Sequence, residues 1–187
     1  MSRTFKKNRT NHQPEYMNEL MKKQAFEHIS YEMRRLASSY ERWLILITGN
    51  GDRFETDDIL ELVLVHTRAV MEFLGKTRIV PKRDPKYARY DDDIISEDYG
   101  FKSCDLKIDS RIKIRIDKEV AHLSYSRCGL SDLEKAWPFH EFVPYLLSIC
   151  HEFVVFAESQ YRNTASADHL GYLSIAIHDL QKYKKIA

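Results

Sequence analysis

Residues 26–48 read FEHISYEMRRLASSYERWLILIT, and this stretch decides the fold. Its large apolar side chains recur at alternating spacings of three and four residues, which is the period of an α-helix that buries one face. They are Phe26, Ile29, Met33, Leu36, Tyr40, Trp43 and Ile47. We therefore expect one long helix, from about Glu15 to Thr48, that packs through this stripe into a helical bundle.

Residues 56–75 carry the next helical pattern. Thr56 and the two aspartates after it supply an N-terminal cap and an acidic first turn, and Gly75 is a typical helix end. The expected apolar stripe consists of Ile59, Leu62, His66, Ala69 and Phe73. Since a histidine in such a stripe is usually a hydrogen-bonded core residue, we do not expect His66 to be a ligand. Arg68 and Glu72 are expected to pair along the helix.

The C-terminal third of the chain predicts two more helices. Residues 131–134 (Ser-Asp-Leu-Glu) form a capping box, and Pro138 suits the first position of an apolar helix that continues to about Ser159. Pro144 lies in the first two turns of that helix, so we expect it to bend the helix or to mark a later start. A last amphipathic helix is expected over residues 165–185.

Two segments between these helices have weaker patterns. Residues 76–103 break the helical period, which predicts a long surface excursion with a short helix over 91–98. Residues 105–125 fit both a strand, through the alternation over 106–116, and a helix. A lone strand would have no partner, so the helix is the favoured interpretation.

The composition is typical of a single all-α domain. The chain has 187 residues, with 29 basic and 28 acidic side chains and a net charge of +1, so any contact with nucleic acid must be local. Few glycines and prolines interrupt the helical patterns. We expect residues 15–187 to form one bundle of about five helices, and residues 1–14 to form a disordered basic arm.

The cysteine pattern and the hydropathy predict a cytoplasmic protein. The chain has three cysteines, Cys104, Cys128 and Cys150, without a C-x-x-C spacing, which argues against a disulfide framework and a cysteine zinc site. The apolar runs are interrupted by charge, and no apolar segment follows the basic N-terminus. We therefore expect no membrane span, no cofactor and no bound metal.

Arg115, Glu119 and His122 form the main candidate site. On a helix, residues four and seven positions apart lie on one face, which makes these three side chains a polar ladder at the margin of the apolar stripe. An arginine that binds phosphate and a histidine that transfers a proton can cleave RNA without a metal. The same spacing also fits an ordinary Arg–Glu pair with a neighbouring histidine.

This stretch resembles the signature of the HEPN superfamily, which comprises all-helical domains marked by an arginine, four to six intervening residues and a histidine. Arg115 and His122 match the signature with six residues between them. Ile116 departs from it, because many members have a polar residue there, and Ser124 departs where some toxin-type members have a tyrosine. Helix order over about residues 20–160 is also similar.

The resemblance implies a metal-independent endoribonuclease that leaves a 2′,3′-cyclic phosphate. It implies that Arg115 binds the phosphate, that His122 transfers the proton and that Glu119 orients one of them. It also implies a homodimer, because the site of such proteins is usually shared between two subunits. A separate antitoxin would be a further protein partner.

The segment before residue 91 is a second candidate contact for single-stranded RNA. Cations and aromatic rings interleave there, a composition that suits unpaired bases and phosphates, although an ordinary basic loop has the same composition. The RNA-binding candidates are Arg83, Lys86, Tyr87 and Arg89.

Two other classes of function stay open from the sequence. One is a non-catalytic helical module that dimerises and binds a protein partner through an apolar face. The other is a metal-dependent bundle enzyme, because Glu119 and His122 form a Glu-x-x-His unit like those of di-iron bundles. Such a site needs a second Glu-x-x-His, and the sequence has none.

Overall fold

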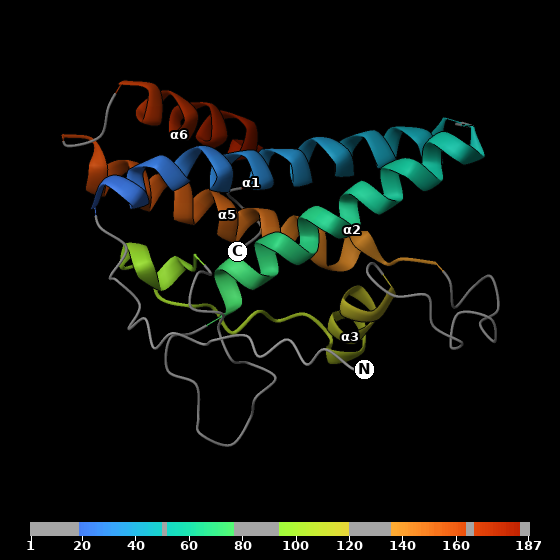
Figure 1. Cartoon of the computed structure of the whole chain (residues 1–187). Helices are drawn as coiled ribbons and strands as arrows, with labels where there is room; N and C mark the ends of the chain where they lie inside the picture. The colour runs from blue at the N-terminus through green and yellow to red at the C-terminus, as the bar shows by residue number, and fades with distance from the viewer. Residues whose placement is uncertain (1–18, 50–51, 77–93, 120–135, 164–166, 184–187) are drawn as a thin grey trace, which may run out of the picture.

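The computed structural model describes residues 19–49, 52–76, 94–119, 136–163 and 167–183. The described residues form five α-helices and two short 3-10 helices, without a β-strand (Figure 1). The α-helices are α1 (Glu19–Thr48), α2 (Arg53–Gly75), α3 (Ser110–Glu119), α5 (Phe139–Tyr161) and α6 (Ala167–Leu180). The 3-10 helices are η2 (Ser96–Tyr99) and η4 (Gln181–Tyr183). The expected all-α bundle is therefore confirmed.

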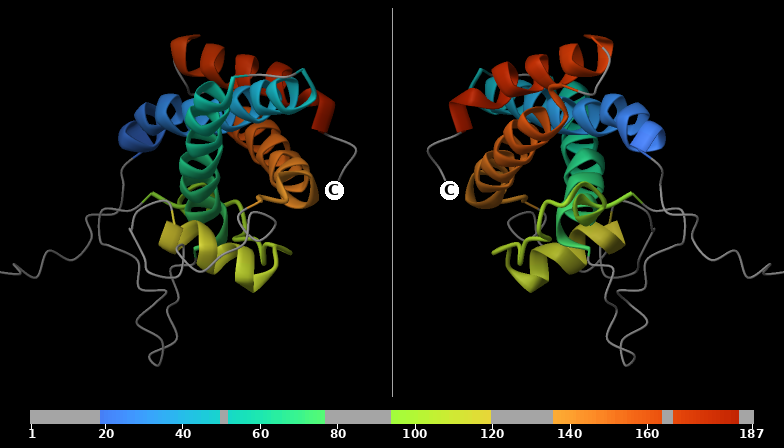
Figure 2. Two further views of the ribbon diagram at one scale, coloured as in Figure 1. Left: turned by 90° about the vertical axis from the view of Figure 1, so that its right-hand side faces the viewer. Right: turned by 90° about the vertical axis from the view of Figure 1, so that its left-hand side faces the viewer.

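Helix α1 is the central element of the bundle. It forms an antiparallel hairpin with α2 and also packs on α6 and α5, while α5 and α6 pack on each other. Figures 1 and 2 show α6 on one side of α1, and α2 followed by α3 on the other. The hairpin end, where α1 stops and α2 starts, extends past α6 (Figure 1).

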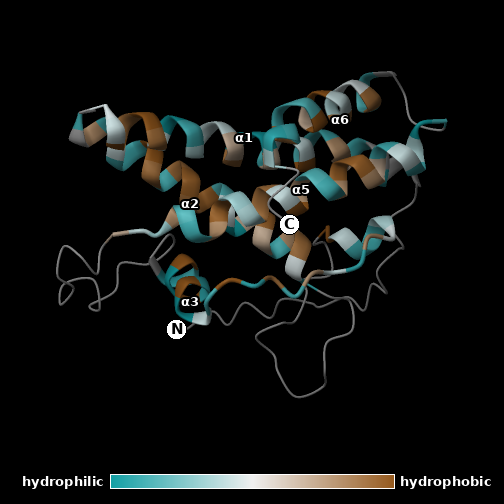
Figure 3. Ribbon diagram, turned by 180° about the vertical axis from the view of Figure 1, so that it is seen from behind, coloured by the Kyte–Doolittle hydropathy of each residue, from teal (hydrophilic) through white to brown (hydrophobic). Residues whose placement is uncertain are grey.

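The core is built from the faces that the helical period predicts. Phe26, Met33 and Leu36 of α1 are almost fully buried, with exposed fractions of 1% or less. Helix α5 supplies the largest buried set: Phe139, Phe142, Val143, Leu146, Leu147, Cys150, Phe153, Val154 and Ala157. In Figure 3 apolar and polar stretches alternate along the helices, as amphipathic helices require. One contiguous apolar cluster joins all five helices.

Three helix expectations are wrong in detail. Helix α2 begins at Arg53 rather than at Thr56, whose hydroxyl donates to the Asp52 carbonyl at 2.8 Å inside the first turn. Ile47 is 49% exposed, because it lies where the hairpin projects beyond its neighbours. Helix α5 begins at Phe139 and continues through Pro144, so the later start is wrong, while a bend at the proline stays a prediction.

The buried face of α2 differs from the expected stripe. Leu62 and Ala69 are only partly buried, whereas the most buried residues are Val63, Leu64, Thr67, Val70 and Leu74. Helix α2 contacts α1 most extensively and also contacts α3, α5 and η2. A helix covered on more than one side buries a wider face than a single stripe predicts.

Residues 94–103, the described part of the surface excursion expected over 76–103, are packed on the bundle instead, as are the residues up to 109 that follow them. Ile95, Tyr99, Leu106 and Ile108 are each at most 6% exposed. The segment also completes hydrogen bonding at the end of α2, because the Cys104 amide donates to the Leu74 carbonyl at 2.9 Å. Residues 77–93 lie outside the described residues.

The ambiguous segment divides into two parts. Residues 101–109 are extended without a partner strand, and α3 begins at Ser110. Asp109 caps α3, because its carboxylate accepts from the Arg111 amide at 2.7 Å. The helix favoured for this segment is therefore confirmed over 110–119 and wrong over 105–109, while residues 120–125 lie outside the described residues.

Helix α5 is apolar enough to cross a membrane by length and composition, unlike the other helices of the described part of the chain. This differs from the expectation that no apolar run is long enough. In its most apolar window, 61% of the helix is buried inside the bundle. The core helix of a soluble protein passes the same test, so this feature is a weak indication of a membrane span.

Candidate functional site

Arg115 lies at the junction of α3 with the start of α5. The guanidinium carbon lies 4.0 Å from the centre of the Trp137 ring, within the range of a cation–π contact. Nη1 of Arg115 donates to the Ala136 carbonyl at 3.2 Å. The Arg115 side chain is thus oriented by two contacts from the residues just before α5.

Helix packing explains why Arg115 is only half-buried. Ile116 is fully buried and fixes α3 on the bundle, while Ile114 on the opposite side is 50% exposed. Arg115 lies between these two directions on the helix. The sequence prediction that Arg115 lies at the margin of the buried face agrees with this position.

The structure describes only part of the predicted polar ladder. Arg115 and Glu119 lie on α3, and Glu119 is the last residue of that helix. His122 lies outside the described residues, so its position relative to Arg115 stays a prediction. The four RNA-binding candidates Arg83, Lys86, Tyr87 and Arg89, the capping box at 131–134, and the N-terminal arm lie outside them as well.

An ion-pair network connects α3 with α2. Nε of Arg68 lies 3.2 Å from Oε1 of Glu72 and 3.6 Å from Oδ1 of Asp117. The predicted Arg68–Glu72 pair is confirmed, but the sequence did not indicate that Asp117 joins it. Asp117 directly follows the buried Ile116 in the sequence. A carboxylate beside a buried residue lies close to the helix that covers that residue, and this position could have suggested a basic partner on α2.

His66 is the buried, hydrogen-bonded histidine that its place in the α2 stripe predicts. Its residue is 6% exposed, and Nδ1 lies 2.7 Å from Oε2 of Glu32 on α1. The partner was missed from the sequence. It could have been found from the hairpin, because residues at similar distances from the connection between α1 and α2 face each other, as Arg42 and Glu55 also do.

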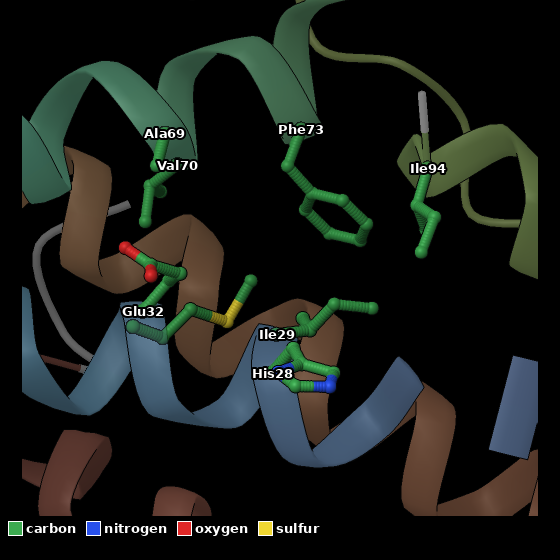
Figure 4. A pocket seen from close by; sticks show the side chains of 8 residues that line it. His28, Ile29, Glu32, Ala69, Val70, Phe73 and Ile94 are labelled. Atoms are coloured by element: carbon green, nitrogen blue, oxygen red, sulfur yellow. The ribbon is translucent and has the colours of Figure 1, made fainter. Parts of the chain in front are cut away.

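A pocket opens beside this pair, between α1, α2 and residue 94 (Figure 4). Its volume is about 190 Å³, and its lining is mostly apolar. The lining residues are His28, Ile29, Glu32, Met33, Ala69, Val70, Phe73 and Ile94. The sequence did not indicate this pocket, because its walls come from three separate parts of the chain.

The cysteines of the described part of the chain are unsuited to nucleophilic catalysis. Burial raises the pKa of the Cys104 thiol, and the nearby Glu152 carboxylate raises it further. Cys150 is fully buried, which raises the pKa of its thiol well above the usual range. A thiol with a raised pKa is largely protonated at neutral pH, and the thiolate is the reactive form.

Metal ligands are also not clustered in the described ranges. No group of three His, Cys, Asp or Glu residues is arranged there to hold a metal ion. Comparison with known proteins gives no further assignment: no family model, no curated protein and no solved structure matches this chain.

Proposed function

We propose that this chain is a HEPN-like, RNA-associated helical domain that acts as a homodimer and cleaves RNA without a metal. Arg115 binds and neutralises the scissile phosphate in this proposal, His122 transfers the proton, and Glu119 orients one of these two side chains. The attacking 2′-hydroxyl loses its proton to a base and forms a bond to phosphorus. The 5′-oxygen then leaves with a proton, and a 2′,3′-cyclic phosphate remains.

The orientation of Arg115 is the observation that carries the proposal. A guanidinium binds phosphate through N–H groups that lie in its plane, and stacking on an aromatic ring uses its face instead. The Arg115 guanidinium carbon lies 4.0 Å from the centre of the Trp137 ring, and this contact restricts the side chain. An arginine whose side chain is already restricted loses less conformational entropy when it binds a phosphate.

The departures from the HEPN signature weigh against this activity. Ile116 is fully buried and fixes α3 on the bundle, so the position after Arg115 has a packing role. A polar residue at that position is therefore not available to assist Arg115.

Cleavage of a mixed single-stranded RNA tests the proposal. We expect cleavage in the presence of a chelator, with 2′,3′-cyclic phosphate ends detected by mass spectrometry. Arg115→Ala and His122→Ala should each abolish it, whereas Arg111→Ala should retain it, because Arg111 is exposed on the same helix and pairs with Asp109. Full cleavage by Arg115→Ala, or no cleavage by the wild-type chain, would contradict the proposal.

A second candidate function is a non-catalytic module that associates through the hairpin end. Ile45, Ile47 and Phe54 are large apolar residues there, with exposed fractions of 60%, 49% and 79%. They lie on the last turn of α1 and the first turn of α2. Exposed apolar residues that gather at one end of a molecule are typical of protein contact surfaces.

The oligomeric state of hairpin-end variants separates the two candidates. If the module associates through this end, Ile45→Lys combined with Phe54→Lys should convert the oligomer into a monomer in light-scattering measurements. Val155→Lys is the matched control, since Val155 is an exposed apolar residue on α5. Unchanged association in the double variant would exclude this surface.

A further inference from the structure

We infer that the pocket between α1 and α2 is a binding site for a small ligand that combines an aromatic or aliphatic body with a protonated amine. This site is separate from Arg115 and does not depend on the proposed ribonuclease activity. It is defined by Glu32 and His28 at one side and by the side chains of Phe73 and Ile94 at the other (Figure 4).

The size of the pocket limits its ligand. A volume of about 190 Å³ is slightly larger than a cavity of about 150 Å³ that accepts benzene in an engineered protein. One ring or a short branched chain would fill it. The walls contributed by Ile29, Met33 and Val70 are apolar, and these three residues are buried, so they favour a hydrocarbon body.

The charge at the pocket favours a cation. Oε2 of Glu32 is engaged by Nδ1 of His66 at 2.7 Å. The other oxygen, Oε1, has no hydrogen-bond partner among the described residues. Glu32 lines the pocket and is about one-third exposed, so its carboxylate is accessible to an ammonium group at the margin of this apolar pocket. An ammonium would complete the hydrogen bonding of the carboxylate.

Two other lining residues fit this ligand. Phe73, on the opposite side of the pocket, directs its ring into it (Figure 4) and offers an aromatic surface to the body of the ligand. His28, one turn before Glu32, is exposed and lines the same pocket. A neutral imidazole nitrogen can accept a hydrogen bond from an ammonium. The cation Arg68, next to Ala69 in the sequence, is already paired with Glu72 and Asp117.

Three probes of similar shape test the inference on the full chain: phenethylamine (cationic), 2-phenylethanol (neutral) and 3-phenylpropionate (anionic). Binding is followed by backbone amide shifts in NMR titrations. We expect phenethylamine to bind with a millimolar dissociation constant, as ligands of this size do, and to shift the amides of Ala69 and Val70. The alcohol should bind at least about fivefold more weakly, because it lacks the charge-assisted hydrogen bond.

Two variants locate the site. Glu32→Gln should reduce the difference between phenethylamine and 2-phenylethanol to less than about twofold, because it removes the charge while an amide oxygen can still accept from His66. Glu61→Gln, at an exposed residue of α2, is the matched control and should keep the difference. Ala69→Met should abolish binding of all three probes by filling the pocket.

Three results would each overturn a different part of the inference. Equal binding of the amine and the carboxylate would overturn the charge argument, and unchanged binding in Ala69→Met would overturn the location. Absence of shifts with every probe would overturn the inference as a whole. If Ala69→Met fails to fold, Ile94→Ala replaces it and should weaken binding of the amine, since it removes one apolar wall.

Discussion

Arg115 shows how one side chain is positioned by residues distant in the sequence. Its helix is fixed by Ile116, while its guanidinium lies against the ring of Trp137. The Ala136 carbonyl accepts one of its N–H groups at 3.2 Å. Because the stacking partner lies after residues 120–135, no local spacing could have revealed it.

Replacement of Arg115 by alanine should lower the free energy of unfolding by about 1 kcal/mol. This is the sum expected for a partly exposed cation–π contact and one hydrogen bond. Urea denaturation followed by circular dichroism measures it, with Arg111→Ala as a control that should change stability by less than about 0.5 kcal/mol. A loss of several kcal/mol would mean that the cleavage test with Arg115→Ala reports unfolding.

Tyr183 should make stability depend on pH in the alkaline range. Burial raises its pKa to about 12, whereas an exposed tyrosine in the unfolded chain has a pKa of about 10. The folded chain therefore keeps a proton that the unfolded chain releases. The contribution of Tyr183 to the free energy of unfolding is therefore complete below pH 10, and it is lost as the pH rises toward 12.

The variant Tyr183→Phe isolates this effect. It cannot ionise, so its stability should fall less than that of the wild-type chain between pH 10 and pH 12. It also lacks the hydrogen bond from the Tyr183 hydroxyl to Glu41, which is 3.2 Å long. This loss lowers the stability of the variant at every pH at which the folded wild-type chain keeps the Tyr183 proton. Parallel curves for both proteins across this range would refute the prediction, and Tyr31→Phe at an exposed site serves as the control.

At the scale of elements, the segment before α3 depends on α5. Phe153 contacts the rings of Phe73, Tyr99 and Phe101, with centroid distances of 4.8, 5.7 and 5.5 Å. This aromatic cluster holds η2 and the extended residues 101–109 against the bundle. Gly100, with a φ of 79°, allows the turn between these two parts.

Phe153→Ala should destabilise the chain by about 3–5 kcal/mol, because it leaves a cavity at a fully buried site. Phe153→Leu should cost clearly less, because it fills much of that space. Thermal or urea unfolding measures both, and Val155→Ala on the same helix should have little effect. Equal losses for alanine and leucine would contradict a packing explanation.

The elements also show what the sequence can predict. Strong periodicity located α1, α2, α5 and α6 to within a few residues, since burial of one face imposes the helical period. The same rule wrongly placed Ile47 in the core, although it is 49% exposed. The helical period of one helix does not indicate where the helix packed against it ends. Residues 76–103 were assigned to the surface because they lack a helical period, although a segment without that period can still bury side chains such as Ile95 and Tyr99.

Prediction of the candidate site was limited for the same reason. The sequence could place Arg115 at the edge of a helix face, because that depends on local spacing. It could not provide Trp137, the Glu32–His66 pair or the apolar pocket, because each depends on contacts between elements. The part of the ladder that requires His122 stays a prediction.

At the scale of the whole molecule, one apolar cluster extends from α3 to α6. Ile116 on α3 and Leu173 on α6 are both fully buried in it. Ion pairs such as Arg34–Asp179, at 2.6 Å, also connect α1 with α6, but their side chains are more than one-third exposed and add little stability. The cluster should therefore determine how the chain unfolds.

Unfolding of the described bundle should be a single cooperative transition. Ile116→Ala and Leu173→Ala should each cost about 2–5 kcal/mol and shift the same urea transition without changing its slope. Far-ultraviolet circular dichroism and amide exchange monitor it, with Asp179→Asn as a control that should cost less than about 1 kcal/mol. A separate early transition in Ile116→Ala alone would show that α3 unfolds independently.

The contact of Arg115 with Trp137 also gives the molecule its own optical reporter. The chain has two tryptophans, and both pack against Phe139, with ring centres 4.9 Å away for Trp43 and 5.9 Å away for Trp137. Both indoles therefore emit from positions beside the same phenyl ring. One of them, Trp137, contacts the guanidinium of Arg115, the candidate phosphate-binding group. An oligonucleotide that draws Arg115 away from the indole would change that emission, without any added label.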